Sequence, residues 1–294
     1  MLERYFAILE GRALPRFLEA RSAGVLEERA GAARGMLRSC TMCARECGAN
    51  RASGHLGWCG VGARSRVASD FIHLGEELEL TPSHTVFFSG CTMACAYCQN
   101  HDIAFHPDAG RLASPEDLAR SIERRVAQGA RNVNFVGGDP APHLATVLET
   151  LSVLEVRQAV VWNSNMYLSE SAMDLLCDVV DVFLADIRYG DDACALRLSD
   201  APDYTARVRR AIERAHRESE VVLRHLVLPG HLECCTRPVL EWVAGSLSGV
   251  YLNLMFQYRP CHEARQHEGM GRRLTRSEIA QASAMAQEAG VRPA

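Results

Sequence analysis

The chain has 294 residues, of which 48% are hydrophobic and 23% are charged, and its formal net charge is −4. It shows no basic stripe of the kind that neutralises phosphates, so nucleic acid is not expected as a partner. The composition predicts a globular protein with one large domain, or one domain and a small extension.

Two further observations indicate a cytoplasmic protein that does not bind a membrane. No run of about 18 uncharged apolar residues occurs, and residues 1–20 lack the continuous apolar stretch that a signal peptide needs. In that compartment the 12 cysteines indicate metal or redox ligands rather than a disulfide framework. Seven of them fall in two tight groups, at the positions where ligands are expected.

The chain begins with residues 1–38, which we predict to be helical. Leu2, Phe6 and Leu9 lie on one side, and Arg and Glu are frequent, a pattern typical of an amphipathic extension that docks on a core. Residues 39–83 follow as a cysteine-rich metal-binding segment and a linker, with a hairpin expected around residues 68–80.

The cysteine-rich segment carries four thiols within twenty residues, here called the N-terminal quartet: Cys40, Cys43, Cys47 and Cys59. The segment is too short and too polar to form a core of its own. Four cysteines interleaved with glycines are typical of a closed tetrahedral metal site. A structural zinc ion and an iron–sulfur cluster both fit, and the pattern leaves the choice open.

From residue 84 onward, apolar strand-like runs alternate with helical stretches, and residues 84–294 are expected to form one domain. Strands are expected at 84–89, 132–137, 159–164, 180–187, 220–228 and 249–257. Helices are expected near 115–128, 142–155, 169–177, 201–217, 235–246 and 275–289. This alternation predicts a parallel sheet with right-handed crossovers. Six such units fit either a doubly wound sheet or a barrel-like array.

The first of these strands leads into the stretch SGCTMACAYCQN, whose segment 91–98 we call the three-cysteine loop: Cys91, Cys95 and Cys98. Four-iron clusters are normally held by four cysteines, so three leave one iron with an open position. An open metal position can bind and activate a small molecule. Zinc with a distant fourth ligand, or reduced thiols in a turn, are the alternatives.

Polar residues follow the later strands, at the edge where parallel α/β folds bind ligands. In Gly137-Gly138-Asp139 the glycines allow close approach of the backbone to a ligand, and the carboxylate can accept hydrogen bonds from an ammonium group. Further candidates for ligand binding, each also compatible with an exposed rim position, are Asn163, Asn165, Asp186, Arg188, Arg224 and His231.

The strings CTMCARECGANRASGHLGWC, FSGCTMACAYCQN, FVGGDPAPH and NLMFQYRP resemble the radical S-adenosylmethionine (SAM) superfamily, and within it the pyruvate formate-lyase activating-enzyme-like proteins. The resemblance covers residues 40–275. It implies an α/β fold, a (β/α)6 partial TIM barrel of the radical SAM type with a small N-terminal cysteine-rich extension. It implies a [4Fe–4S] cluster on the three-cysteine loop, SAM contacts from Gly137, Gly138 and Asp139, and a place for Tyr97 beside the adenine. The further candidates for cofactor binding are Asn163, Asn165, Asp186, Arg224 and His231.

The resemblance also implies a reaction, in which reductive cleavage of SAM gives a 5′-deoxyadenosyl radical that abstracts hydrogen from a substrate. Reduced flavodoxin or ferredoxin is the expected electron donor, and a glycine of a partner protein is the first candidate substrate. Modification of a small molecule, nucleoside or peptide is the second hypothesis, and a non-catalytic metal-binding interaction protein is the third. Two features differ from glycyl-radical activating enzymes: the motif acid is Asp139 rather than glutamate, and the extra cysteines precede the three-cysteine loop.

Overall fold

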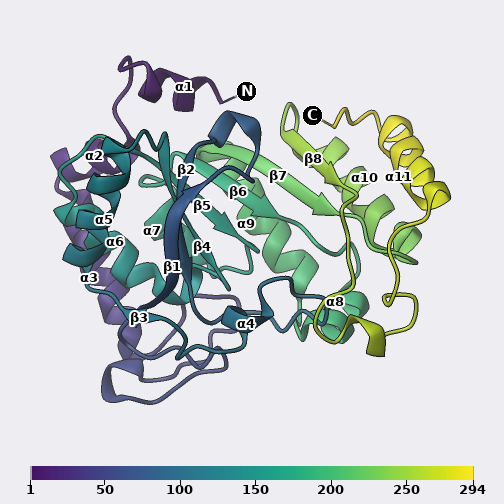
Figure 1. Ribbon diagram of the computed structural model, residues 1–294, viewed down its shortest axis with the longest axis horizontal. Helices are drawn as coiled ribbons and strands as arrows, with labels where there is room; N and C mark the ends of the chain where they lie inside the picture. The colour runs from purple at the N-terminus through teal and green to yellow at the C-terminus, as the bar shows by residue number, and fades with distance from the viewer. Residues whose placement is uncertain (1, 294) are drawn as a thin grey trace.

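The computed structural model describes residues 2–293 and is built around one eight-stranded sheet with the order β3-β1-β2-β4-β5-β6-β7-β8 (Figure 1). The six strands from β2 to β8 in this order run parallel, whereas β1 is antiparallel to both β2 and β3. The strands are β1 (Arg66–His73), β2 (Ser83–Phe88), β3 (Arg111–Leu112), β4 (Asn132–Gly137), β5 (Ala159–Ser164), β6 (Val182–Asp186), β7 (Glu220–Leu226) and β8 (Tyr251–Met255).

Helices connect the parallel strands, and α3, α5 and α6 lie together on one outer side of the sheet (Figure 1). The α-helices are α1 (Glu3–Leu9), α2 (Arg16–Ser22), α3 (Val25–Gly35), α4 (His101–Ala104), α5 (Pro115–Ala127), α6 (Leu144–Val153), α7 (Glu170–Leu176), α8 (Asp192–Ser199), α9 (Tyr204–Glu218), α10 (Arg237–Ser246) and α11 (Arg276–Glu288). The shorter turns are η1 (Met36–Arg38), η2 (Arg51–Ser53), η3 (Leu78–Leu80), η4 (Ala141–His143), η5 (Leu232–Thr236), which is a π-helix, and η6 (Ala264–Gln266).

The predicted array of six parallel strands is confirmed, and it corresponds to β2 and β4–β8. Because β3 and β8 are the two edges of the sheet, the array is open, as expected for a partial barrel. The helices expected near 115–128 and 275–289 are also confirmed, as α5 and α11. The side chains of Ser114 and Thr275 each accept a hydrogen bond from the backbone N–H three residues later, and each forms a capping box.

The hairpin expected around residues 68–80 is confirmed in part, because its second strand is β2 at residues 83–88 and does not lie before residue 80. Residues 66–73 form one strand, β1, which pairs with β2, so that Ile72 lies opposite His84. Residues 78–80 form a 3-10 turn instead of a return strand. The alternation of Glu and Leu over residues 77–80 imitates a strand, but the neighbouring Glu76 side chain is only 7% exposed and faces Arg224 of β7.

The loop between β1 and β2 connects several strands of the sheet through its two glutamates. The Glu76 carboxylate accepts hydrogen bonds from Asn134 on β4 and from Arg224 on β7, at 3.2 and 3.3 Å. Beside it, Glu77 accepts a hydrogen bond of 2.9 Å from Asn253 on β8. One short loop therefore holds three strands that are far apart in sequence.

Helix α1 covers the same end of the sheet from outside, above the strands in Figure 1. Its Tyr5 and Ile8 pack with Val161, Val182 and Val222 in a small apolar core separate from the main one. Leu80 of the loop between β1 and β2 belongs to the same small core. Helix α1 and this loop therefore close the amino end of the sheet together.

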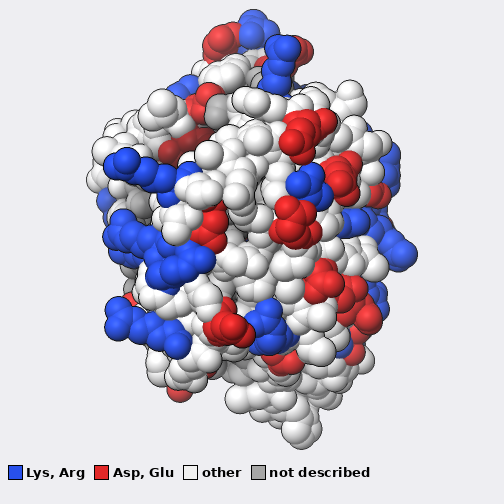
Figure 2. All heavy atoms as spheres, turned by 90° about the vertical axis from the view of Figure 1, so that its right-hand side faces the viewer, with Lys and Arg blue, Asp and Glu red and all other residues white. Residues whose placement is uncertain are grey.

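The exposed surface carries charge of both signs. On the face shown in Figure 2, basic and acidic groups are both present, with wide uncharged areas between them. Among residues 2–293, no helix has both the length and the apolar character needed to cross a membrane.

Candidate active site

A cavity of about 400 Å³ lies at the carboxyl ends of the parallel strands. All three thiols of the three-cysteine loop line it. Eight of the nine predicted cofactor-binding residues line it as well: Tyr97, Gly137, Gly138, Asp139, Asn163, Asn165, Asp186 and Arg224. His231 is placed elsewhere, with its Nδ1 atom 3.3 Å from the sulfur of Cys234.

Cys91 and Cys95 of the three-cysteine loop are buried and have polar side chains beside their sulfur atoms, whereas Cys98 is half-buried. The Asn165 amide lies 3.7 Å from Cys91 Sγ, and the Ser199 hydroxyl donates to Cys95 Sγ over 3.1 Å. Burial raises the pKa of Cys91 above its usual range and that of Cys98 to about 12. A bound metal cluster offsets this cost of ionisation, because metals bind cysteine as the thiolate. Three thiols that line one cavity therefore fit a metal cluster.

The backbone of the three-cysteine loop is anchored to the last turn of α8. The N–H groups of Ala94 and Ala96 donate to the carbonyl oxygens of Ser199 and Leu198, at 2.9 and 2.8 Å. Helix α8 was not predicted, because its eight residues carry no strong apolar period. It begins at Asp191, whose side chain accepts a hydrogen bond from the backbone N–H of Cys194.

The two glycines after β4 are required by the close approach of the neighbouring strand end. A Cβ atom on Gly137 would lie 2.1 Å from the carbonyl oxygen of Phe88, and one on Gly138 would lie 2.1 Å from that of Gly90. These glycines therefore bring the backbone after β4 against the residue that precedes Cys91. Close packing of the backbone is therefore sufficient to explain why both residues are glycine.

Alanine at Gly138 is expected to lower the free energy of unfolding by about 3 kcal/mol, as overpacking at a rigid backbone does, and to lower iron binding. Gly31 in α3 has no heavy atom within 4 Å of a built Cβ, so Gly31→Ala is the matched control. The control is expected to gain about 0.5–1 kcal/mol, because alanine is the better helix former. Urea unfolding measures both changes, and equal stability of G138A and the parent protein would contradict the packing argument.

Asp139 is buried, and both of its oxygen atoms have protein partners. One accepts a hydrogen bond of 2.9 Å from the Ala141 N–H; the other accepts from the Ser164 hydroxyl at 3.1 Å and the Asn165 N–H at 3.0 Å. Burial raises its pKa to about 6. The carboxylate thus fixes the backbone after β5, a role that the sequence pattern did not suggest.

A network of charged side chains forms the opposite wall of the cavity. Arg224 donates to Asp186 at 2.7 Å and to Asn163 at 2.6 Å, and Arg188 donates to the second oxygen of Asp186 at 2.7 Å. Glu76 completes the network 3.3 Å from Arg224, and burial raises its pKa above the usual range. Glu76 was not predicted as a site residue, because nothing in the sequence around it indicates a contact with Arg224, 148 residues away.

The N-terminal quartet gathers around a buried arginine. Burial raises the pKa of Cys43 to about 12, and the negative charges of Cys59, Cys40 and Cys47 add to the rise. Arg51 is 2% exposed, and within residues 2–293 no carboxylate lies within ion-pairing distance of it. Its guanidinium donates to two carbonyl oxygens and lies 3.7 Å from Cys40 Sγ. A buried cation favours anionic thiolates beside it, which fits a metal centre.

The quartet adjoins the three-cysteine loop. Arg45 Nε donates to the carbonyl oxygen of Thr92 over 2.8 Å. A Cβ atom on Gly90 would lie 2.4 Å from Val61 and 3.4 Å from the carbonyl oxygen of Cys59. The last cysteine of the quartet is therefore packed against the residue before Cys91.

His143 ties the segment after Asp139 to the strand that leads into the three-cysteine loop. Its Nε2 atom lies 2.9 Å from the carbonyl oxygen of Ser89, and its ring stacks on Phe88 at 4.5 Å. Burial lowers its pKa to about 3. The folded protein thus holds this ring neutral, while the unfolded chain binds a proton below its ordinary pKa of about 6.5.

The stability that neutral His143 contributes is complete above pH 6.5 and is lost as the pH falls toward 3. From pH 6.5 to 5 this amounts to about 2 kcal/mol, taking 1.4 kcal/mol for each pKa unit. A His143→Gln variant is expected to lose less unfolding free energy over this interval than the parent protein, in urea titrations at several pH values. Parallel pH profiles would show that His143 is not held neutral.

Three comparisons with known proteins agree with this geometry. Residues 85–243 match the family model of the radical SAM superfamily. The uncharacterised protein MJ0674 of Methanocaldococcus jannaschii is 39% identical over 280 residues, covering 92% of this chain and 81% of MJ0674.

Two solved structures share the fold, at sequence identities too low to show more. Streptococcus suis SuiB bound to the precursor peptide SuiA aligns with a TM-score of 0.51 at 10% identity, over 67% of this chain and 43% of SuiB. A radical SAM methyltransferase from Sphaerobacter thermophilus aligns with a TM-score of 0.51 at 14% identity, over 73% of this chain and 66% of the methyltransferase. This chain therefore spans less than half of SuiB and about two thirds of the methyltransferase.

The family model covers more than half of the chain, and the three thiols predicted to hold a cluster line one cavity. The chain belongs to the radical SAM superfamily.

Proposed function

We propose that this radical SAM enzyme abstracts hydrogen from a glycine of a partner protein. The observation that carries the proposal is the size of the cavity. Its volume of about 400 Å³ lies near the lower end of the range for one small-molecule ligand. The cluster thiols and the predicted SAM contacts already share this space, so a substrate has to reach into it from outside. A flexible polypeptide segment meets that requirement better than a second enclosed molecule.

Different residues of the cavity are proposed to bind the cluster and SAM. We propose that Cys91, Cys95 and Cys98 hold a [4Fe–4S] cluster, with hydrogen bonds to their sulfurs from Asn165 and Ser199. When bound, the cluster and SAM together supply the reductive cleavage that gives a 5′-deoxyadenosyl radical.

SAM is proposed to lie between the Gly137–Asp139 segment and the charged wall around Arg224. The hydrogen bonds of Asp186 and Asn163 to Arg224 fix the direction of the guanidinium before a ligand binds. Such preorganisation places the reacting atoms without a further cost of ordering.

Reduced flavodoxin or ferredoxin is the proposed electron donor, and the N-terminal quartet is proposed to hold a second metal centre. The contact between Cys59 and Gly90 supports this arrangement, since it brings the quartet against the three-cysteine loop. An iron–sulfur cluster there can relay electrons, whereas zinc would stabilise the loop.

The test uses anaerobically reconstituted enzyme with SAM, reduced flavodoxin and candidate polypeptides that carry α-deuterated glycine. We expect deuterium in 5′-deoxyadenosine, measured by mass spectrometry, and a carbon-radical signal on the polypeptide by electron paramagnetic resonance. Deuterium transfer from a labelled small molecule, with none from any polypeptide, would reject the protein substrate.

A further inference from the structure

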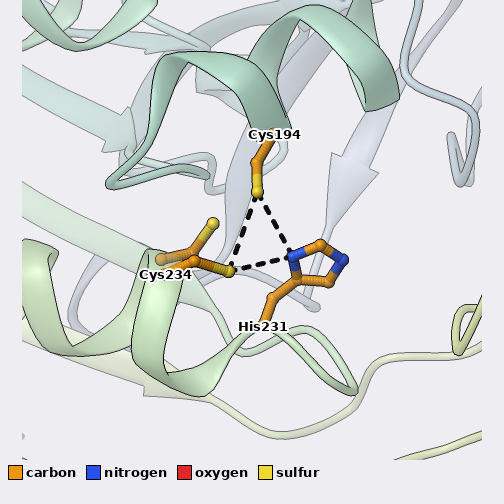
Figure 3. Close-up of side chains that lie close together, drawn as sticks. Cys194, His231 and Cys234 are labelled. Carbon is orange, nitrogen blue, oxygen red and sulfur yellow. Dashed lines mark hydrogen bonds between the residues drawn. The ribbon is translucent and has the colours of Figure 1, made fainter.

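A compact group of potential metal ligands lies outside the cavity and outside the quartet. Among residues 2–293, it is the one group of at least three Cys, His, Asp or Glu side chains whose ligand atoms all lie within 4.8 Å of one another: Cys194, His231, Cys234 and Cys235. Figure 3 shows the side chains of Cys194, His231 and Cys234 pointing toward one another. None of these four residues lines the cavity.

The separations within the group are those of a tetrahedral ion. Zinc–sulfur and zinc–nitrogen bonds of about 2.3 and 2.05 Å at tetrahedral angles place two sulfurs about 3.8 Å apart, and a sulfur and a nitrogen about 3.5 Å apart. Here Cys194 Sγ lies 3.7 Å from Cys234 Sγ and 3.5 Å from His231 Nδ1. The distance between Cys234 Sγ and His231 Nδ1 is 3.3 Å. The cysteines of a four-iron cluster each bind a different iron, so this tight triangle indicates one ion.

We propose that Cys194, His231 and Cys234, with Cys235 as the fourth ligand, form a mononuclear zinc site. Three thiolates and one neutral imidazole are a ligand set of structural zinc. The ligands come from two segments of the chain: Cys194 from the first turn of α8, and the other three from the π-helical turn before α10.

The surroundings of the site match the negative charge of such a complex. Arg197 lies on α8 with its guanidinium 4.0 Å from Cys194 Sγ. Cys235 is 1% exposed, and the Gly190 N–H donates to its sulfur. Hydrogen bonds and a cation near the sulfurs stabilise the thiolate form that binds metal.

The π-helical turn is a second sign of a functional site. The carbonyl oxygen of His231 accepts hydrogen bonds from the N–H groups of both Cys235, at 3.0 Å, and Thr236, at 3.2 Å. π-Helical turns are rare in proteins, and those that occur are often found at functional sites. Here the turn directs the side chains of His231 and Cys234, three residues apart, to the same point (Figure 3).

The proposed ion has a defined structural role. It joins the first turn of α8 to the turn before α10, while the last turn of α8 holds the three-cysteine loop through Ser199 and Leu198. Helix α8 is then fixed at both ends. The zinc is a positioning element for Cys95, and it takes no part in the reaction.

The first test is a metal analysis of full-length protein. Cys194→Ser/Cys234→Ser is expected to contain one zinc per chain less than the parent protein, whereas the control Cys177→Ser, which removes a cysteine outside all three thiol groups, keeps its zinc. Circular dichroism checks that both variants are folded. Equal zinc in the parent and the double variant would overturn the proposal.

The second test needs no variant, so a folding defect cannot obscure it. Alkylation of the folded parent protein, followed by peptide mass spectrometry, is expected to leave Cys194 and Cys234 unmodified until a zinc chelator is added. A Cys194–Cys234 disulfide, released by reductant and not by chelator, would overturn the proposal. Labelling that is equally fast with and without chelator would overturn it too.

Discussion

Alanine at Cys95 is expected to reduce the formation of 5′-deoxyadenosine to the level measured without enzyme. Two thiols remain on the loop, and a cluster that normally has three or four cysteine ligands cannot be retained by two. The loss also removes the acceptor of the Ser199 hydroxyl, which donates to this sulfur over 3.1 Å. Iron content is expected to fall by about four atoms per chain, the content of one [4Fe–4S] cluster.

Cys177→Ala is the matched control for this variant. Cys177 is a buried cysteine at the end of α7 and belongs to none of the three thiol groups. It is expected to keep both iron and activity. Substantial 5′-deoxyadenosine from C95A would exclude Cys95 as an essential ligand. Iron that remains in the Cys91/Cys95/Cys98 triple alanine variant would exclude a quartet that binds only zinc.

Replacing Asp139 with alanine is expected to lower the free energy of unfolding by about 3–5 kcal/mol and to remove most of the activity. Each buried donor left without an acceptor costs about 1–3 kcal/mol, and this carboxylate serves Ala141, Ser164 and Asn165. Activity falls with stability because Asn165, whose amide contacts Cys91 Sγ, loses its backbone support.

The Asp139→Asn variant tests the charge of this side chain alone, because asparagine has nearly the same size as aspartate but does not ionise. The pKa of Asp139 is raised by burial to about 6, above the value of about 3.9 in an unfolded chain. The folded state therefore favours the protonated acid, and this contribution is present below pH 4 and lost as the pH rises through 6. The unfolding free energy of the parent protein minus that of D139N should fall between pH 4 and 6. A constant difference would mean that burial does not raise this pKa.

The parts of the fold that the sequence predicted are those set by local patterns. Apolar runs marked β2 and β4–β8, and the helical stretches expected near 115–128 and 275–289 correspond to α5 and α11. The thiols of the three-cysteine loop were predicted to share one site because they are three or four residues apart, and they line one cavity.

The parts that were missed depend on contacts between distant segments. Glu76 belongs to the cavity because Arg224 lies over it, and nothing near residue 76 indicates this partner. Cys194 and Cys234 are 40 residues apart in the sequence, and no local pattern indicates that His231 lies beside both of their sulfur atoms.

Helix α1 and the loop around Glu76 block one end of the sheet. Ligands therefore reach the cavity only from the opposite end. SAM, its cleavage products and the substrate must enter and leave on the side of the three-cysteine loop. A polypeptide seated over that mouth would trap whatever lies beneath it. We therefore expect a compulsory sequence of events: SAM binds first, the target segment follows, and methionine departs only after that segment has withdrawn.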